Sequence, residues 1–130
     1  MPQLKDTNRS DGHLVELFIA DQLRQRGFVI LEQNYTLGKL EVDLIALEGD
    51  TLCFIEVKAR KHPFILSELE EVITPEKQEH MVVVSDAYCR FAKRVPYKSV
   101  RFDYVLVYLP DGITPKKVQY IRDAFTPTCI

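Results

Sequence analysis

The sequence predicts an α/β domain in which one mixed sheet is flanked by helices. Segments 12–26 and 75–94 carry apolar residues at helical spacing, and five strand-like segments accompany them. The order along the chain is helix, three strands, helix, two strands, with no repeat or linker between them. Because 130 residues suit one hydrophobic core, we expect a single domain over 1–130, with a loose polar segment at 1–10.

The first helix is predicted over residues 12–26 from signals at its two ends. Ser10 or Asp11 suits the N-cap, and Gly27 suits the left-handed residue that often follows a helix. Glu16 shares a line of this helix with apolar residues, so we expect its carboxylate beside the apolar stripe and away from the solvated side.

Three strands follow the first helix. The segment 28–31, continuing toward Tyr35, is the first, and segments 40–47 and 52–58 form a hairpin. Gly49 suits the first central position of a type II′ turn between the hairpin strands.

An irregular stretch is expected at 61–73, before the second helix. Thr74 is a good cap and Pro75 is favoured at the first helical position. Residues 82–84 could also form a strand, but this start signal and the helical spacing of the apolar residues favour a helix reaching about residue 94.

Two strands complete the predicted sheet. Residues 101–109 are strongly strand-like, and 118–121 form a short edge strand after the turn at 110–112. We expect Arg101 and Asp103, on the first of these strands, to form a structural ion pair.

The hairpin carries the functional argument. With a turn centred on 49–50, cross-strand pairing sets Asp43 opposite Glu56, and Glu41 opposite Lys58, all on one face. A slip of one residue would move one acid to the other face. The opposite face is then apolar at each position: Val42, Leu44, Ala46, Cys53, Ile55 and Val57.

Two opposed carboxylates need a compensating charge. Directly paired residues have β-carbons about 5 Å apart, so like charges repel, and burial increases the cost. Mg²⁺ relieves this repulsion, since it binds through one or two carboxylates, waters and phosphate oxygens. Lys58, further along the same face, could reach a phosphate or an attacking water. The alternative is an exposed patch of surface ion pairs, which contribute little stability.

The sequence also resembles a known family. Asp43 followed by Glu56-Val57-Lys58 is similar to the D…ExK signature of the PD-(D/E)xK nuclease superfamily. The whole chain more closely resembles the YraN-like family (UPF0102), predicted endonucleases related to archaeal Holliday-junction resolvases. The segments that carry the likeness are 12–16, 38–46, 54–60, 74–78, 101–103 and 123–125. Ala59 stands where the family commonly has threonine.

The resemblance implies a restriction-endonuclease-like fold and a Mg²⁺- or Mn²⁺-dependent endonuclease acting on structured or branched DNA. It implies that Asp43, Glu56 and the Val57 carbonyl bind the metal and that Lys58 is the catalytic lysine. Glu16 is either a further acid at that site or a boundary carboxylate bonded to backbone. A homodimer would follow by analogy with resolvases, which make two cuts.

Other residues have two interpretations each. Glu41 would either contact the metal through a bound water or pair with Lys58. Lys77 is expected to point toward the sheet and to bind phosphate or support the site, the alternative being a solvated lysine at a helix end. We also predict nucleic-acid contacts from Gln78, which is next to Lys77, and from Arg60 and Lys61, which follow the second strand of the hairpin.

Composition limits the remaining choices. A net charge of −2 argues against a protein that coats nucleic acid nonspecifically. The apolar runs are too short to span a bilayer and the N-terminus lacks a signal-peptide core, so we expect a cytoplasmic protein without membrane contact. The competing hypothesis is a non-catalytic module that binds nucleic acid or protein with the same fold.

Overall fold

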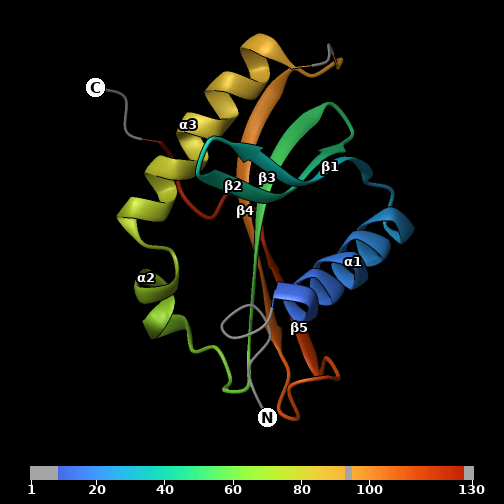
Figure 1. Ribbon diagram of the computed structural model, residues 1–130, viewed down its shortest axis with the longest axis vertical. Coiled ribbons are helices and arrows are strands. Elements are labelled where there is room, and N and C mark those ends of the chain that lie inside the picture. The colour runs from blue at the N-terminus through green and yellow to red at the C-terminus, as the bar shows by residue number, and fades with distance from the viewer. Residues whose placement is uncertain (1–8, 93–94, 128–130) are drawn as a thin grey trace.

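The computed structural model describes residues 9–92 and 95–127, with side chains from His13 onward (Figure 1). In chain order the elements are α1 (Arg9–Gln25), β1 (Val29–Leu37), β2 (Leu40–Glu48), β3 (Thr51–Arg60), the 3-10 helix η1 (Leu66–Glu68), α2 (Leu69–Val72), α3 (Pro75–Phe91), β4 (Ser99–Tyr108) and β5 (Lys117–Ile121). Within these ranges no helix is long and apolar enough to cross a membrane.

The five strands form one mixed sheet in the order β1-β2-β3-β4-β5. Strands β3 and β4 are parallel, and the other neighbours are antiparallel. Helix α1 lies on one side of the sheet, and α2 and α3 lie on the other (Figure 1). The predicted mixed sheet between helices is therefore confirmed.

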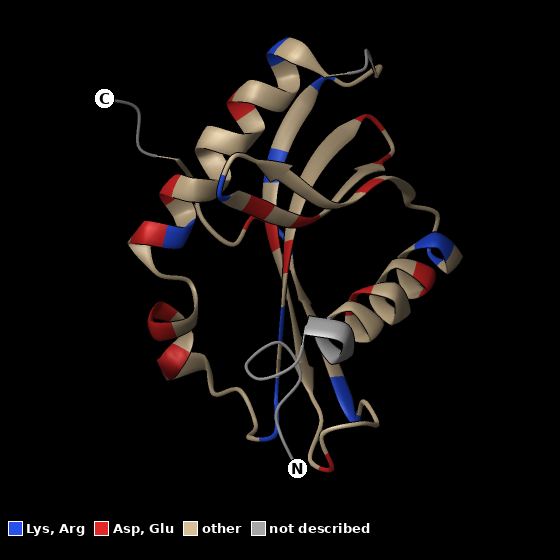
Figure 2. Ribbon diagram, in the orientation of Figure 1, with Lys and Arg blue, Asp and Glu red and all other residues tan. Residues whose placement is uncertain are grey.

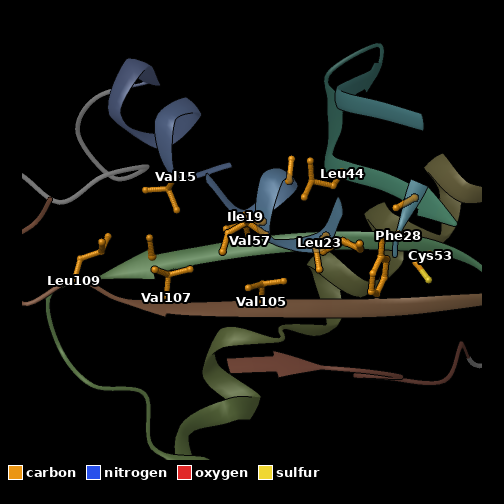
Figure 3. Packing of buried hydrophobic residues seen from close by; sticks show 14 residues of the cluster. Val15, Ile19, Leu23, Phe28, Leu44, Cys53, Val57, Val105, Val107 and Leu109 are labelled. Atoms are coloured by element: carbon orange, nitrogen blue, oxygen red, sulfur yellow. The ribbon is translucent and has the colours of Figure 1, made fainter. Parts of the chain in front are cut away.

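Helix α1 packs its apolar stripe onto one face of β3 and β4 (Figure 3). Val15, Ile19 and Leu23 are at most 4% exposed, and they meet buried side chains such as Val57 and Val105. Burying such side chains removes apolar surface from water, which is the main source of stability for this layer.

Helix α3 covers the other face through a second apolar cluster. Met81, Val84 and Tyr88 are buried at helical spacing, which confirms a helix over residues that could also have been a strand. The Tyr88 ring meets Phe54 edge-on, with ring centroids 5.9 Å apart. The sheet is therefore covered on both faces, and acids placed on it become buried.

Several boundaries differ from those predicted. Helix α1 begins at Arg9, so its first turn includes Ser10 and Asp11, the residues expected to cap it. Helix ends are the part of an element that sequence signals fix least well. Of the segment expected to be loose, residues 1–8 lie outside the described part of the chain. The stretch 61–73 contains the short η1 and α2, and α3 ends at Phe91.

The predicted register of the β2–β3 hairpin is confirmed over five pairs, from Glu48 opposite Thr51 to Leu44 opposite Ile55. Gly49 has φ 62°, while Asp50 has no positive φ, as a type II′ turn requires. The glycine is needed here because other residues adopt this conformation at a cost.

The register stops short of the acidic pairs. Pairing between β2 and β3 ends at Leu44–Ile55, so the prediction that Asp43 pairs with Glu56, and Glu41 with Lys58, across the two strands is wrong. Beyond this point β2 follows β1 and curves toward α3, while β3 continues along β4 (Figure 1). The two strands separate because each follows its other neighbour.

This curvature also changes the face on which Val42 lies. Val42 packs in the cluster on the α3 side together with Ile45, whereas Leu44 belongs to the cluster under α1. The prediction that Val42 shares the face of Leu44 is therefore wrong, because strict alternation holds only while a strand stays flat.

Candidate active site

The candidate site lies where β2 and β3 separate. Asp43 Oδ2 accepts a hydrogen bond of 2.8 Å from the backbone N–H of Val57, so a side chain replaces the ladder at this point. Asp43 is 5% exposed, and a buried carboxylate of this kind requires such donors. The bond fixes Asp43 next to the residue that follows Glu56.

Two lysines meet the carboxylate of Glu56, which is buried at 3% exposure. The Nζ atom of Lys77 lies 3.2 Å from Glu56 Oε2, and that of Lys58 lies 3.6 Å from the same oxygen. Lys77 also donates to the backbone carbonyl of Glu41, at 3.3 Å. Lys77 thus connects α3 to both separated strands, which confirms that it points toward the sheet.

The start of α3 places Lys77 there. Thr74 caps the helix by accepting from the N–H of Lys77 at 3.2 Å, and Pro75 follows at the first helical position, as predicted. Gln78 donates its side-chain amide to the carbonyl of Ile73 at 3.2 Å. Gln78 therefore stabilises this helix start, and its predicted contact with nucleic acid stays a prediction.

The charges of Glu56 and Asp43 both act on the hydroxyl of Tyr104. Tyr104 pairs with Glu56 across the parallel β3 and β4 strands and is fully buried. Burial, and then the negative charges of Glu56 and Asp43, raise the pKa of its hydroxyl. Charges from β2 and from β3 therefore converge on one buried position. Among the described residues its hydroxyl has no hydrogen-bond partner.

A third buried acid enters from α1. Glu16 is 4% exposed, as its place beside the apolar stripe predicted. Asn34 on β1 is in hydrogen-bonding reach of both Glu16 and Glu41, through its amide. Sequence reasoning missed Asn34. An asparagine within a strand was nevertheless a usable signal, because asparagine is uncommon in strands and tolerates left-handed backbone.

A cleft of about 610 Å³ adjoins the two lysines, on the α3 side of the sheet. Its walls come from the end of β3, the segment after it, α2 and the start of α3, and they include Lys58, Arg60, His62, Glu71, Glu76, Lys77 and His80. Figure 2 shows acidic positions of the sheet gathered where the strands cross, with basic positions farther along β3 and at the start of α3. The cleft therefore has a mixed lining of basic and acidic side chains, and through Lys58 and Lys77 it lies next to the buried Glu56.

Arg60 supports one wall of this cleft. Its guanidinium donates to the backbone carbonyls of His62 and Pro63, at 3.1 and 2.8 Å, and lies over the ring of Phe64, 4.1 Å from the centroid. These contacts shape the segment after β3. Lys61 beside it is half-buried. A nucleic-acid contact by either residue stays a prediction.

A separate polar network lies near the hairpin turn. Arg101 donates to Asp103 at 2.9 Å and to Glu48 at 2.7 Å, which confirms the predicted structural pair. Arg122 also binds Glu48, and Tyr120 donates to the fully buried Asp103. The hydrogen bond from Arg122, and then that from Arg101, lowers the pKa of Glu48 to about 2 despite partial burial.

The described residues contain no group of three or more His, Cys, Asp or Glu side chains arranged to hold a metal. The smaller donor set that the family resemblance implies, Asp43, Glu56 and the Val57 carbonyl, has the oxygen chemistry that suits Mg²⁺ or Mn²⁺. Both acids are buried, and the hydrogen bond from the Val57 N–H holds Asp43 beside the residue that follows Glu56. The residues present therefore fit a hard divalent ion that keeps several waters.

Comparison with known proteins gives one consistent match. Residues 15–107 match the model of the family described as "Uncharacterised protein family UPF0102". A "UPF0102 protein" of Pseudomonas aeruginosa (strain LESB58) is 31% identical over 121 residues, covering 93% of this chain and 96% of the relative. One from Dictyoglomus thermophilum is 36% identical, covering 91% and 98%, and one from Syntrophus aciditrophicus is 38% identical, covering 91% and 90%.

Proposed function

We propose that this chain, which belongs to the uncharacterised protein family UPF0102, is a metal-dependent endonuclease that hydrolyses DNA phosphodiester bonds. We assign its sheet and helices to the restriction-endonuclease-like PD-(D/E)xK class. The observation that carries the proposal is the gap between β2 and β3, where Asp43 binds the Val57 N–H and Glu56 meets two lysines beside a partly basic cleft.

Asp43, Glu56 and the carbonyl of Val57 would hold Mg²⁺ or Mn²⁺, with Glu16 and Glu41 as candidates for contact through water. When bound, the ion supplies Lewis-acid polarisation of the phosphoryl group and a bound water of lowered pKa. The hydrogen bond of 2.8 Å from Val57 keeps one Asp43 oxygen in place, so the acid needs little rearrangement to bind.

Lys58 is the residue best placed to act on the substrate. Its side chain is 40% exposed and lines the cleft, whereas Lys77 is 24% exposed and is held by Glu56 and by the Glu41 carbonyl. An ammonium group at the cleft wall stabilises the negative charge that develops on the phosphoryl oxygens, or orients the attacking water. Lys77 in turn keeps Glu56 in position.

The local charge of the cleft reconciles a polyanionic substrate with a net charge of −2. Lys58, Arg60 and Lys77 line it together with two histidines and two acids, Glu71 and Glu76, so the cleft offers cations to phosphate groups although the whole chain is weakly acidic. A preference for structured or branched DNA, and a homodimer that makes two cuts, rest on the resemblance to resolvases.

The experiment is a cleavage panel of duplex, single-strand, flap and four-way-junction DNA, with and without Mn²⁺. Asp43→Ala and Glu56→Ala should abolish cleavage and weaken Mn²⁺ binding, measured by calorimetry. Lys58→Ala should retain Mn²⁺ binding and lose turnover. Asp50→Ala, an exposed acid at the turn of the same hairpin, is the matched control and should cleave normally. Equal cleavage by the first three variants and the control would reject the assignment.

One observation favours a second candidate, a module that binds nucleic acid without cutting it. Glu56 already meets two ammonium groups, so part of its charge is compensated without a metal. This candidate predicts salt-sensitive DNA binding with no strand scission during long incubation with Mg²⁺ or Mn²⁺. Lys58→Ala would then weaken binding, while Asp43→Ala would leave binding intact.

A further inference from the structure

Asn34 occupies an unusual backbone conformation within β1. Its φ is 53°, and of the described residues only Asn34 and Asp123 combine a side chain with a positive φ. The neighbouring pairs Gln33–Leu44 and Tyr35–Val42 continue the ladder on either side, which sets Asn34 opposite Asp43. Left-handed backbone within a strand is strained for any residue except glycine, and asparagine tolerates it best among the others.

The side chain of Asn34 explains why glycine does not stand there. With its nitrogen toward the acids, the amide donates to Glu16 Oε1 at 2.5 Å and to Glu41 Oε1 at 3.0 Å, and its oxygen accepts from His13 Nδ1 at 3.0 Å. The reverse orientation would set the amide oxygen against two carboxylates. One amide thus joins acids from α1 and β2.

We propose that Asn34 is a positioning residue that holds Glu16 and Glu41 together beside Asp43 for the metal-dependent site. The inference rests on the proposed function. Two carboxylates from different elements repel one another, and Glu16 is 4% exposed, so water screens little of this repulsion. The two N–H donors of Asn34 satisfy one oxygen of each acid, and the two carboxylates fix the direction of the amide, whose oxygen accepts from His13.

Asn34→Gly separates the backbone role from the side-chain role. Glycine adopts the positive φ without strain, so the variant keeps the strand and loses only the amide. Partners that orient metal-binding residues typically change activity or metal affinity by about 10- to 100-fold. We expect Asn34→Gly to lower kcat by that factor and to weaken Mn²⁺ binding, with little change in KM for DNA, since no DNA contact is removed.

Two comparisons make the test specific. Asp123→Gly makes the same kind of replacement at the other left-handed residue, and its N–H keeps its bond to Asp103. This control should leave kcat unchanged. In a Glu16→Ala background, Asn34→Gly should cost less than about threefold further, because residues that act as a unit are not additive. Wild-type kcat and Mn²⁺ affinity in Asn34→Gly, or fully multiplicative losses, would overturn the inference.

A second measurement separates this inference from the nuclease proposal. In EDTA, the shift of the urea midpoint caused by Asn34→Gly should differ between wild type and the Glu16→Ala background, since the bond exists only with both partners. The shift should be unchanged in a Glu79→Ala background, an exposed acid of α3. If wild type neither cleaves nor binds Mn²⁺, the nuclease proposal fails, while equal shifts in all three backgrounds reject the role of Asn34.

Discussion

Replacing Lys77 by methionine tests how the buried charge of Glu56 is compensated. Methionine keeps much of the length and apolar body of the side chain and removes the ammonium group. That group lies 3.2 Å from Glu56 Oε2 and 3.3 Å from the carbonyl of Glu41. The substitution therefore removes a charge and a hydrogen-bond donor where the two strands have separated, with little loss of volume.

The expected cost follows from the geometry. Two unit charges 3.2 Å apart attract by about 5 kcal/mol at an effective dielectric constant of about 20. Most of this is offset, because burying the Lys77 ammonium to 24% exposure has a desolvation cost, and Lys58 remains 3.6 Å from the same oxygen. We therefore expect Lys77→Met to lower the free energy of unfolding by about 2 kcal/mol.

Urea unfolding without metal, followed by circular dichroism, measures this cost. The matched control is Lys98→Met, since Lys98 is 85% exposed and its Nζ lies 3.9 Å from Oδ2 of Asp50, an acid that is also exposed. A surface pair of this kind contributes less than about 1 kcal/mol. In a Glu56→Gln background the cost of Lys77→Met should fall by at least half. Equal costs for the two lysines, or an unchanged cost in that background, would refute the reasoning.

Two further predictions concern stability. Because hydrogen bonds from Arg122 and Arg101 lower the pKa of Glu48 from 4.5 to about 2, its ionised form stabilises the fold above about pH 4.5, and this contribution is lost as the pH falls toward 2. Glu48→Gln should therefore cost about 1 kcal/mol at pH 7, allowing for solvent screening, and nearly nothing at pH 2 by urea titration. Ile19→Ala, at a residue 1% exposed under α1, should cost about 3 kcal/mol, whereas Leu14→Ala, 61% exposed on the same helix, should cost under about 0.5 kcal/mol in the same assay. Equal costs for the two helix variants, or a pH-independent cost for Glu48→Gln, would contradict these assignments.

The features that the sequence predicted correctly have local causes. Gly49 alone suits the positive φ of the hairpin turn, and that turn fixes the register from Glu48 to Leu44. Thr74 and Pro75 start α3 where a cap and a fixed φ are needed. The spacing of apolar residues predicted that both helices pack on the sheet, because the apolar stripe of a helix must be buried against another element.

The tertiary structure decided how the hairpin ends. From the sequence, Asp43 and Glu56 were expected to face each other across a regular ladder, yet pairing stops at Leu44 and Ile55. The strands separate because β2 also follows β1, whose Asn34 has left-handed backbone, whereas β3 follows β4. The residues of the hairpin alone do not show that β2 pairs with β1 and β3 with β4 on their outer sides.

The contacts of the candidate site likewise depend on packing between distant segments. Lys77 reaches Glu56 and Glu41 only because α3 lies on the sheet, and Asn34 joins Glu16 to Glu41 only because α1 lies beside β1 and β2. Residue types and local spacing determined which groups carry charge and which elements carry them. Their distances were decided by the packing of helices on a twisted sheet, since electrostatic and hydrogen-bonding interactions depend on positions that no short segment fixes alone.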